Sequence, residues 1–321
     1  FLIGWAYSGA RRSVGASSLK IFSHHLIRAR EVNEPTRPVL RYHGGKWLLA
    51  PWIIGFFPPH RVYVEPFGGG GSVLLRKPPI HSEVYNDRFD EVVNVFRVLR
   101  DPAMAAELKR LVDLTPFARS EFQETYVAVE DPVDRARRTI ARSFMGFGSA
   151  SIIKTHSTGF RANSKRSGTP PALDWFNWPE QIEAFTARLR RVVVENKDAL
   201  DVVAQQDGPD TLIYADPPYP HDTRGNANGV RQKYAFEMSD DDHRAMAAVL
   251  REVEGMVVLS GYPCDLYDRE LFPDWERHQK VHMADGARER VEVLWLNPAC
   301  SARRAAHQRQ RSLLDVAAGA A

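Results

Sequence analysis

The sequence predicts an α/β protein with a doubly wound, mostly parallel sheet into which a helical segment is inserted. Short, continuous apolar runs recur along the chain, as is typical of strands that are covered on both faces. Segments with helical spacing separate these runs. In residues 101–189 this alternation stops, and helix-like segments follow one another with no strong strand signal between them.

Each element follows from local residue types. Strands are predicted where β-branched or aliphatic residues cluster, at residues 62–64, 84–85, 192–194, 212–215, 256–259 and 291–296. Helices are predicted at residues 72–76, 91–99 and 245–250. The last of these follows Ser239 and three aspartates, which suit a helix N-terminus.

The chain divides into four parts on this reading. Residues 37–100 and 190–300 form one α/β domain. Residues 101–189 form a second, helical domain, with helices expected at 103–111, 132–144 and 179–190. Residues 1–36, which begin with Phe1, are interpreted as a leader that is either disordered or not native. Residues 301–321 form a tail that is either helical or frayed.

Composition excludes several classes of protein. Hydrophobic residues at 44% and charged residues at 26% are ordinary for a globular chain and exclude a disordered or collagen-like one. The sequence contains no apolar run of the roughly 18–20 residues that a membrane-spanning helix needs. Cys264 and Cys300 lie far apart, so neither a disulfide framework nor a cysteine-based metal site is expected, and a cytoplasmic location is favoured.

The charge distribution indicates a nucleic-acid contact. The net charge is +3, but residues 135–173 hold eight basic residues and no aspartate or glutamate. Basic segments with small polar residues suit phosphate contacts. A loop at residues 220–234 carries further cations and is interpreted equally well as a lid or as a plain surface loop. DNA contacts are therefore predicted at Arg142, Lys154, Arg161, Lys165, Arg166, Arg231 and Lys233.

A glycine-rich turn follows the first predicted strand. It reads Glu65-Pro-Phe67-Gly68-Gly-Gly70-Gly-Ser72 and precedes a predicted helix. Such a turn lets a ligand approach the bare backbone above a helix N-terminus. It lacks the third glycine of the dinucleotide fingerprint and the GK[ST] ending of a phosphate-binding loop. Asp87, after the second strand, is placed either to bind ribose hydroxyls or to cap a helix.

A second motif, Asp216-Pro217-Pro218-Tyr219, ends the strand at residues 212–215. The paired prolines hold the backbone rigid at the sheet edge where ligands bind. Asp216 and the carbonyl of Pro217 supply two acceptors and Tyr219 a flat ring, which together fit an exocyclic amine on a planar base. Near the N-terminus, Tyr42-His-Gly-Gly-Lys46 offers a close backbone approach and a cation, although a turn before a helix explains it equally well.

These motifs, in this order, resemble those of the Dam-like (D12 class) adenine-N6 DNA methyltransferases. The resemblance rests on Tyr42-x-Gly-Gly-Lys46, the glycine turn from Glu65 to Ser72, Asn86-Asp87 and Asp216-Pro-Pro-Tyr219, and spans about residues 37–298. It implies a Rossmann-like, S-adenosylmethionine-dependent methyltransferase sheet with an inserted helical target-recognition domain.

The resemblance also implies a cofactor, S-adenosyl-L-methionine, and a set of residues that bind it. Cofactor contacts are expected from Tyr42, Lys46, Glu65, Phe67, Gly68, Gly70, Asp87, Asp198 and Asp216, although Asp198 could equally cap the helix that follows it. Asp216, Pro217, Pro218 and Tyr219 would carry the catalysis. No metal is expected. The partner would be double-stranded DNA, with a cognate restriction endonuclease also expected, and the chain would act as a monomer.

The mechanism expected on this basis is direct transfer. Hydrogen bonds from adenine N6 to Asp216 and the Pro217 carbonyl would aim the nitrogen lone pair at the sulfonium methyl, while the flipped base stacks on Tyr219. Two alternatives stay open: an N4-cytosine methyltransferase, whose substrate offers the same kind of amine, and a catalytically silent DNA-binding relative. A nicotinamide-dependent dehydrogenase is disfavoured because the third glycine is missing.

Overall fold

The structure is a computed structural model and describes residues 34–152, 158–162, 168–223, 234–284 and 288–319. The expected leader at residues 1–36 lies almost entirely outside the described residues. No helix in the described part of the chain is long and apolar enough to cross a membrane.

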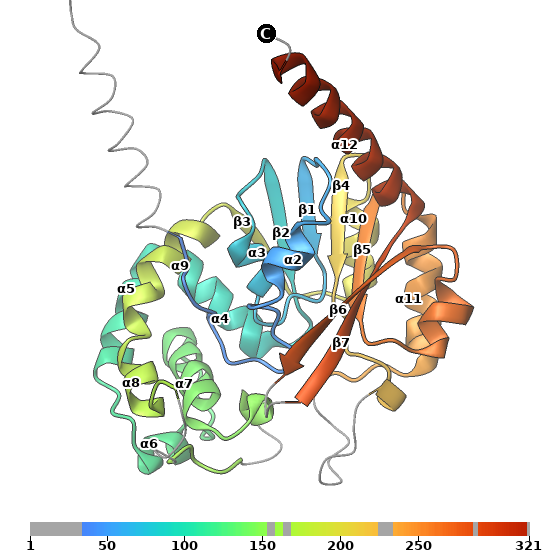
Figure 1. The fold of residues 1–321 in the computed structure, drawn as a ribbon. Helices are drawn as coiled ribbons and strands as arrows, with labels where there is room; N and C mark the ends of the chain where they lie inside the picture. Colours follow the sequence, from blue (N-terminus) through green and yellow to red (C-terminus); the bar gives the residue numbers. More distant parts are fainter. Residues whose placement is uncertain (1–33, 153–157, 163–167, 224–233, 285–287, 320–321) are drawn as a thin grey trace, which may run out of the picture.

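A single seven-stranded sheet organises the molecule, with the strand order β3-β2-β1-β4-β5-β7-β6 (Figure 1). The five strands from β3 to β5 are parallel, whereas β7 runs antiparallel to β5 and β6 antiparallel to β7. The strand order reverses between β1 and β4, which is the point where open α/β sheets bind ligands. The strands are β1 (Val62–Glu65), β2 (Ser82–Asn86), β3 (Val192–Glu195), β4 (Thr211–Ala215), β5 (Met256–Gly261), β6 (Glu276–Ala284) and β7 (Arg288–Leu296).

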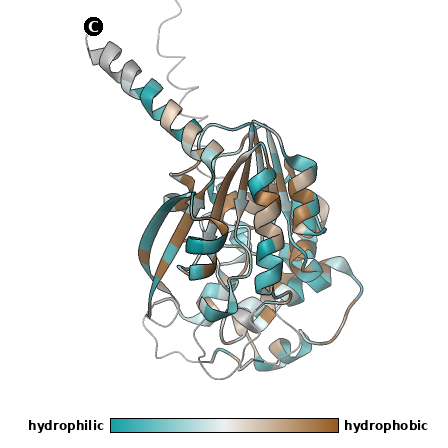
Figure 2. Ribbon diagram, turned by 90° about the vertical axis from the view of Figure 1, so that its right-hand side faces the viewer, coloured by the Kyte–Doolittle hydropathy of each residue, from teal (hydrophilic) through white to brown (hydrophobic). Residues whose placement is uncertain are grey.

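Helices cover both faces of the sheet. Successive strand residues point to opposite faces, so Tyr214 packs into one hydrophobic cluster while Ile213 and Ala215 pack into the other. One face is covered by α2 (Ala50–Ile54), α3 (Ser72–Arg76) and α4 (Asp90–Arg100), and the other by α10 (Ala199–Gln206) and α11 (Asp240–Glu252). Figure 2 shows the covered strands in brown and the outer turns of the helices in teal.

The helices of the interrupting segment pack on the sheet domain. These are α5 (Pro102–Asp113), α6 (Arg119–Glu124), α7 (Pro132–Met145), α8 (Pro171–Phe176) and α9 (Ile182–Leu189). Both α7 and α9 pack against α4, and the apolar side chains of these helices belong to the same cluster as one face of the sheet. The helical insertion is therefore present as secondary structure, while its standing as a separate domain stays a prediction.

The expected parallel α/β sheet is confirmed, with one strand that the pattern did not predict. That strand is β6, which lies at the edge of the sheet and pairs only with β7. The tail, for which two conformations were open, is helical from Pro298 to Gly319 (α12). Ser239 caps α11 and forms a reciprocal capping box with Asp242.

Candidate active site

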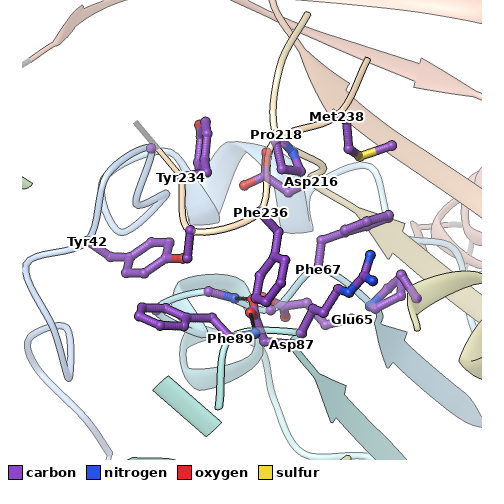
Figure 3. A pocket seen from close by; sticks show the side chains of 18 of the residues that line it. Tyr42, Glu65, Phe67, Asp87, Phe89, Asp216, Pro218, Tyr234, Phe236 and Met238 are labelled. Atoms are coloured by element: carbon purple, nitrogen blue, oxygen red, sulfur yellow. Dashed lines mark hydrogen bonds between the residues drawn. The ribbon is translucent and has the colours of Figure 1, made fainter. Parts of the chain in front are cut away.

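A pocket opens at the carboxyl ends of β1, β2 and β4, at the point where the strand order reverses. Its walls combine the glycine turn, the segment after β2, the Asp216 motif and residues 234–238. Figure 3 shows Asp216 and Pro218 on one side of this pocket, Asp87 and Phe89 on the other, and Phe236 between them. The three motifs that are far apart in the sequence therefore meet at one site.

The glycine turn has little room for side chains. A Cβ on Gly68 would lie 2.2 Å from Cε2 of Tyr85 and 2.9 Å from the carbonyl oxygen of Asn86. Gly69 has φ +47°, in the left-handed region that favours glycine. The turn is held from outside, because the Tyr85 hydroxyl donates to the Gly69 carbonyl at 2.7 Å. Glycine thus allows the backbone to form the pocket floor.

Glu65 ends β1 and caps the helix that follows the turn. Its Oε2 accepts a hydrogen bond from the backbone N–H of Leu74 at 3.0 Å and another from the Tyr63 hydroxyl at 2.8 Å. Gly71, the N-cap residue of α3, has no side chain that could do this. Burial raises the pKa of Glu65 to about 8, although both hydrogen bonds oppose the shift.

Asp87 closes the opposite side of the turn. Its two carboxylate oxygens accept hydrogen bonds at 2.7 Å from the backbone N–H groups of Gly69 and Phe89. Burial raises the pKa of Asp87, and these hydrogen bonds limit the rise. Each carboxylate oxygen keeps lone-pair capacity toward the pocket, so Asp87 can still accept from a hydroxyl of a ligand.

Asp216 forms an ion pair with Lys46 at the pocket wall. The distance from Lys46 Nζ to Asp216 Oδ2 is 2.9 Å, and the same ammonium donates to the Gly44 carbonyl at 2.8 Å. Lys46 is 6% exposed, whereas the Asp216 side chain is 18% exposed and lines the pocket. Lys46 of the N-terminal motif therefore pairs with Asp216, the aspartate that follows β4.

A third carboxylate, that of Glu292 in β7, lies behind this pair. Glu292 is 2% exposed, and its Oε1 lies 2.5 Å from the Tyr219 hydroxyl, 2.5 Å from Ser260 Oγ and 3.6 Å from Lys46 Nζ. Burial by itself lowers the pKa of Lys46, but Asp216 and Glu292 outweigh burial and raise it. Lys46 is therefore charged at neutral pH.

The charge state of Asp216 reflects opposing influences. Burial raises the pKa of its carboxyl group, Lys46 lowers it, and the charge of Glu292 raises it again. The Tyr219 hydroxyl lies 3.0 Å from Oδ1 and 2.5 Å from Glu292 Oε1, so its single proton serves one of these carboxylates at a time; when it is donated to Oδ1, it also favours the ionised form of Asp216. Lys46 and Tyr219 together supply the donors that a buried carboxylate needs.

Tyr219 does not offer the open ring that the motif predicted. The residue is 3% exposed, the ammonium of Lys46 lies 4.9 Å from its ring centroid, and the ring centroid of Tyr262 lies 4.6 Å away in a T-shaped arrangement. A base could stack on this ring only after one of these neighbours moved. Pro217 is also buried, whereas Pro218 lines the pocket.

The remaining predicted cofactor residues do reach the pocket. Tyr42, Phe67, Gly68 and Gly70 line it. Asp198 lines it as well, and its side chain caps α10 by accepting from Leu200 N at 2.9 Å, so the capping interpretation is confirmed and the cofactor contact stays a prediction. Sequence reasoning missed the apolar lining supplied by Phe89, Leu200, Tyr234, Phe236 and Met238.

The missed residue at the centre of the site is Glu292. It stands between Val291 and Val293 in a strand that is otherwise apolar from there to Leu296. A glutamate inside such a run is buried, and buried carboxylates need partners. That signal was available in the sequence, but it does not say which residues are the partners.

The structure describes two of the predicted DNA contacts, and the prediction for Arg142 is wrong. Its side chain is 1% exposed, pairs with Glu91 at 3.1 Å and donates to the Thr125 carbonyl, so it belongs to the core. Arg161 is half-buried and donates to the Phe144 carbonyl at 2.9 Å. The other predicted contacts, Lys154, Lys165, Arg166, Arg231 and Lys233, lie outside the described residues.

Nearby aspartates neutralise the first arginines of the basic stretch at residues 135–173. Arg135 pairs with Asp90, and both Arg137 and Arg138 pair with Asp134. These aspartates precede the stretch in sequence but lie beside it in space. A stretch of sequence without acidic residues is therefore not a surface without them. Within the described ranges, no group of three or more His, Cys, Asp and Glu side chains is placed to hold a metal ion.

Comparisons with known proteins show the family of the chain. The family model described as D12 class N6 adenine-specific DNA methyltransferase matches residues 42–289. The type II methyltransferase M1.LlaDCHI of Lactococcus lactis subsp. cremoris is 24% identical over 271 residues, which cover 79% of this chain and 90% of that protein. The type II methyltransferase M.MjaIII of Methanocaldococcus jannaschii is 23% identical over 239 residues, which cover 68% and 80%.

Proposed function

Because the chain belongs to the D12 class N6 adenine-specific DNA methyltransferase family, and is an adenine-specific DNA methyltransferase, we propose that the pocket binds S-adenosylmethionine with Asp216 as the acceptor for the target amine. The observation that carries this proposal is the position of Asp216. It directly follows β4 at the pocket wall, where Lys46 fixes one of its carboxylate oxygens. A rigid acceptor beside a cofactor-sized pocket is what the reaction requires.

The charge of the pocket lining fits this cofactor. Among the residues that the structure describes, six carboxylate residues line the pocket but only two Lys or Arg residues, Lys46 and Arg88, so a ligand with positively charged sulfur and ammonium groups is favoured. When bound, S-adenosylmethionine supplies an electrophilic methyl group carried on that sulfur. The residues proposed to hold it are Tyr42, Lys46, Glu65, Phe67, Gly68, Gly70, Asp87, Asp198 and Asp216.

Each carboxylate has a distinct task in this proposal. Asp87 accepts from ribose hydroxyls, because its backbone hydrogen bonds fix both oxygens at the end of β2. Glu65, at the N-terminus of α3, faces the ammonium group of the amino-acid part. The aromatic rings of Phe89 and Phe236 cover the apolar faces of the ligand and exclude water.

Asp216 and the Pro217 carbonyl are proposed to accept the two N–H bonds of adenine N6. In free adenine the nitrogen lone pair is delocalised into the ring, so the amine is a weak nucleophile. Two fixed acceptors favour a more tetrahedral nitrogen, whose lone pair then points at the methyl carbon. Fixed acceptors of this kind act through orientation and electrostatic preorganisation, with no covalent enzyme intermediate.

Asp216 lines a pocket in the protein, so the target base must rotate out of the duplex to reach it. Stacking of that base on Tyr219 requires a local rearrangement, because Lys46 and Tyr262 now flank the ring. Double-stranded DNA is proposed as the substrate, acted on by a monomer in the cytoplasm. A cognate restriction endonuclease is also proposed, because both similar relatives are named type II methyltransferases.

The test is transfer of a labelled methyl group from S-adenosylmethionine to unmethylated duplex DNA, followed by digestion and separation of the nucleosides. We expect N6-methyl-2′-deoxyadenosine from the wild-type protein. The Asp216→Asn variant, which keeps the size of the side chain, should lose at least about a hundredfold in kcat, the scale of one preorganised group.

A matched control is Asp207→Asn, remote from the pocket, which should keep its activity. Thermal unfolding of Asp216→Asn, measured beside the wild-type protein, separates a catalytic defect from a folding defect. N4-methylcytosine in place of the expected product would refute the adenine assignment. Near wild-type turnover in Asp216→Asn would refute the role of Asp216.

A further inference from the structure

We propose that one face of the β6–β7 hairpin, carrying Lys280, His282 and Arg290, binds the DNA backbone beside the flipped base. This surface was not among the predicted DNA contacts, which fell on the helical insertion and on residues 220–234. The inference rests on the proposed function, since it places the strand that carries the target nucleotide. We call these three residues the hairpin face.

The strand register places the hairpin face next to the active site. Lys280 pairs with Glu292 and His282 pairs with Arg290. Directly opposed residues of an antiparallel pair point to the same face, and so do residues two apart in one strand. All three members therefore share the face of Glu292, which contacts Lys46 and Tyr219. The hairpin face therefore extends the row of side chains that contains Glu292, in the direction away from Asp216.

Aromatic contacts link the same residues to the catalytic motif. The guanidinium of Arg290 lies 5.7 Å from the ring centroid of Tyr262. The ring centroids of Tyr262 and Tyr219 are 4.6 Å apart. Tyr219 in turn donates to Asp216. On the neighbouring strand, the ammonium of Lys280 lies 5.8 Å from the ring centroid of Trp52. The cations are thus positioned by ring faces.

The described carboxylates do not neutralise the two basic side chains of the hairpin face, Lys280 and Arg290. In the part of the chain that the structure describes, neither Lys280 nor Arg290 forms an ion pair with an acidic side chain. The other face of the hairpin differs, because Arg277 pairs with Asp268 at 2.8 Å and the carboxylate of Glu289 lies there too. Figure 2 shows the hairpin as mostly hydrophilic where it projects from the sheet.

This arrangement suits phosphates. Lysine and arginine gain affinity for DNA by displacing condensed counterions, a contribution that does not depend on sequence. When the target base rotates out of the duplex, the phosphates on either side of it stay near the mouth of the pocket. Lys280, directly opposite Glu292, and Arg290, two residues from Glu292 in β7, are placed to hold them, so the hairpin face would fix the position of the strand.

The test compares the Lys280→Ala, Arg290→Ala double variant with Arg277→Ala, a control from the opposite face of the same hairpin. Dissociation constants for a duplex are measured by fluorescence anisotropy over a series of salt concentrations. In the double variant the slope of log K against log salt should decrease by about 2, about 1 for each lost phosphate contact. The affinity for unrelated duplexes should decrease by the same factor. The Arg277→Ala control should keep the wild-type slope.

A charge-preserving variant, Lys280→Arg with Arg290→Lys, guards against loss of folding and should keep most of the slope. An unchanged slope in the double variant would overturn the proposal, as would an equal loss in the charge-preserving variant. Failure of the wild-type protein to methylate any DNA would instead overturn the proposed function. The two failures are therefore distinguishable within one set of preparations.

Discussion

The hydroxyl oxygen of Tyr219 lies 2.5 Å from Oε1 of Glu292, although one residue follows β4 and the other lies in the middle of β7. Glu292 also lies 3.6 Å from the ammonium of Lys46. Lys46 and Tyr219 are the two side chains that bond to Asp216. Glu292 therefore acts as a positioning residue, since it holds both neighbours of Asp216 from within the core.

Replacing Glu292 by glutamine should slow methyl transfer more than it weakens binding. We expect kcat to fall about tenfold, the scale of one disturbed buried hydrogen bond, with little change in cofactor affinity. Burial is the main cause of the raised pKa of Asp216, and the charge of Glu292 adds to it. Removing that charge should lower the pKa, so the acid limb of the kcat profile should move to lower pH.

The matched control for this prediction is Glu289→Gln, which removes the same charge from the opposite, exposed face of β7. It should leave both kcat and the pH profile unchanged. A Glu292→Gln variant with reduced kcat and an unmoved acid limb would indicate a purely structural role.

Glu65 should make the free protein less stable as pH rises. Its pKa in the folded chain is about 8, mainly because of burial, against an ordinary value of 4.5. A folded-state pKa above the unfolded one means that the stabilising contribution is complete below about pH 4.5 and is lost as pH rises through about 8. Denaturant unfolding across this range should show the decline, and Glu65→Gln should flatten it. Equal slopes in both proteins would contradict the assignment.

Alanine at Gly68 should destabilise the fold and impair cofactor binding. The added Cβ would lie within 2.9 Å of Tyr85 and of the Asn86 backbone, so the turn or β2 must shift. We expect a loss of about 1–3 kcal/mol in the free energy of unfolding, as for other overpacked sites. Gly208→Ala is the control, because its nearest contact would be Thr211 Oγ1 at 3.8 Å. Comparable losses in the two variants would argue against a tightly packed turn.

Arg142→Leu tests whether this arginine belongs to the core. Removing it leaves Glu91 and the Thr125 carbonyl without their partner, so we expect a loss of about 3 kcal/mol in the free energy of unfolding. The salt dependence of DNA binding should not change. Arg97→Ala, which breaks an exposed pair with Asp90, should cost less than about 1 kcal/mol. A reduced salt slope in Arg142→Leu would restore Arg142 to the DNA interface.

The buried parallel strands could be predicted because both of their faces are covered. Such strands read as continuous apolar runs, and the motif residues at their ends then have to share one edge of the sheet. This argument placed the glycine turn and Asp216 at the sheet edge where ligands bind, and the resemblance to the D12 class assigned Glu65, Asp87 and Asp216 to one cofactor site. By contrast, β6 carries polar residues on both faces as an edge strand, so its sequence shows no comparable run.

Pairings across the sheet could not be predicted in the same way. The contact of Glu292 with Tyr219 depends on β7 lying next to β5, and local sequence does not determine strand order. The partner of Arg142 is Glu91, which lies well outside the acid-free stretch that made Arg142 look available. Local patterns report burial and turn chemistry, whereas charge neutralisation depends on contacts that the tertiary fold creates.

The reversed direction of β7 has a practical consequence. Since β7 runs against the parallel strands, it ends at the edge of the sheet opposite the pocket, and α12 leaves the molecule from there (Figure 1). A fluorophore or surface tether on α12 would stand on the far side from bound DNA. The protein could therefore be immobilised through this helix with its substrate entrance facing the solution.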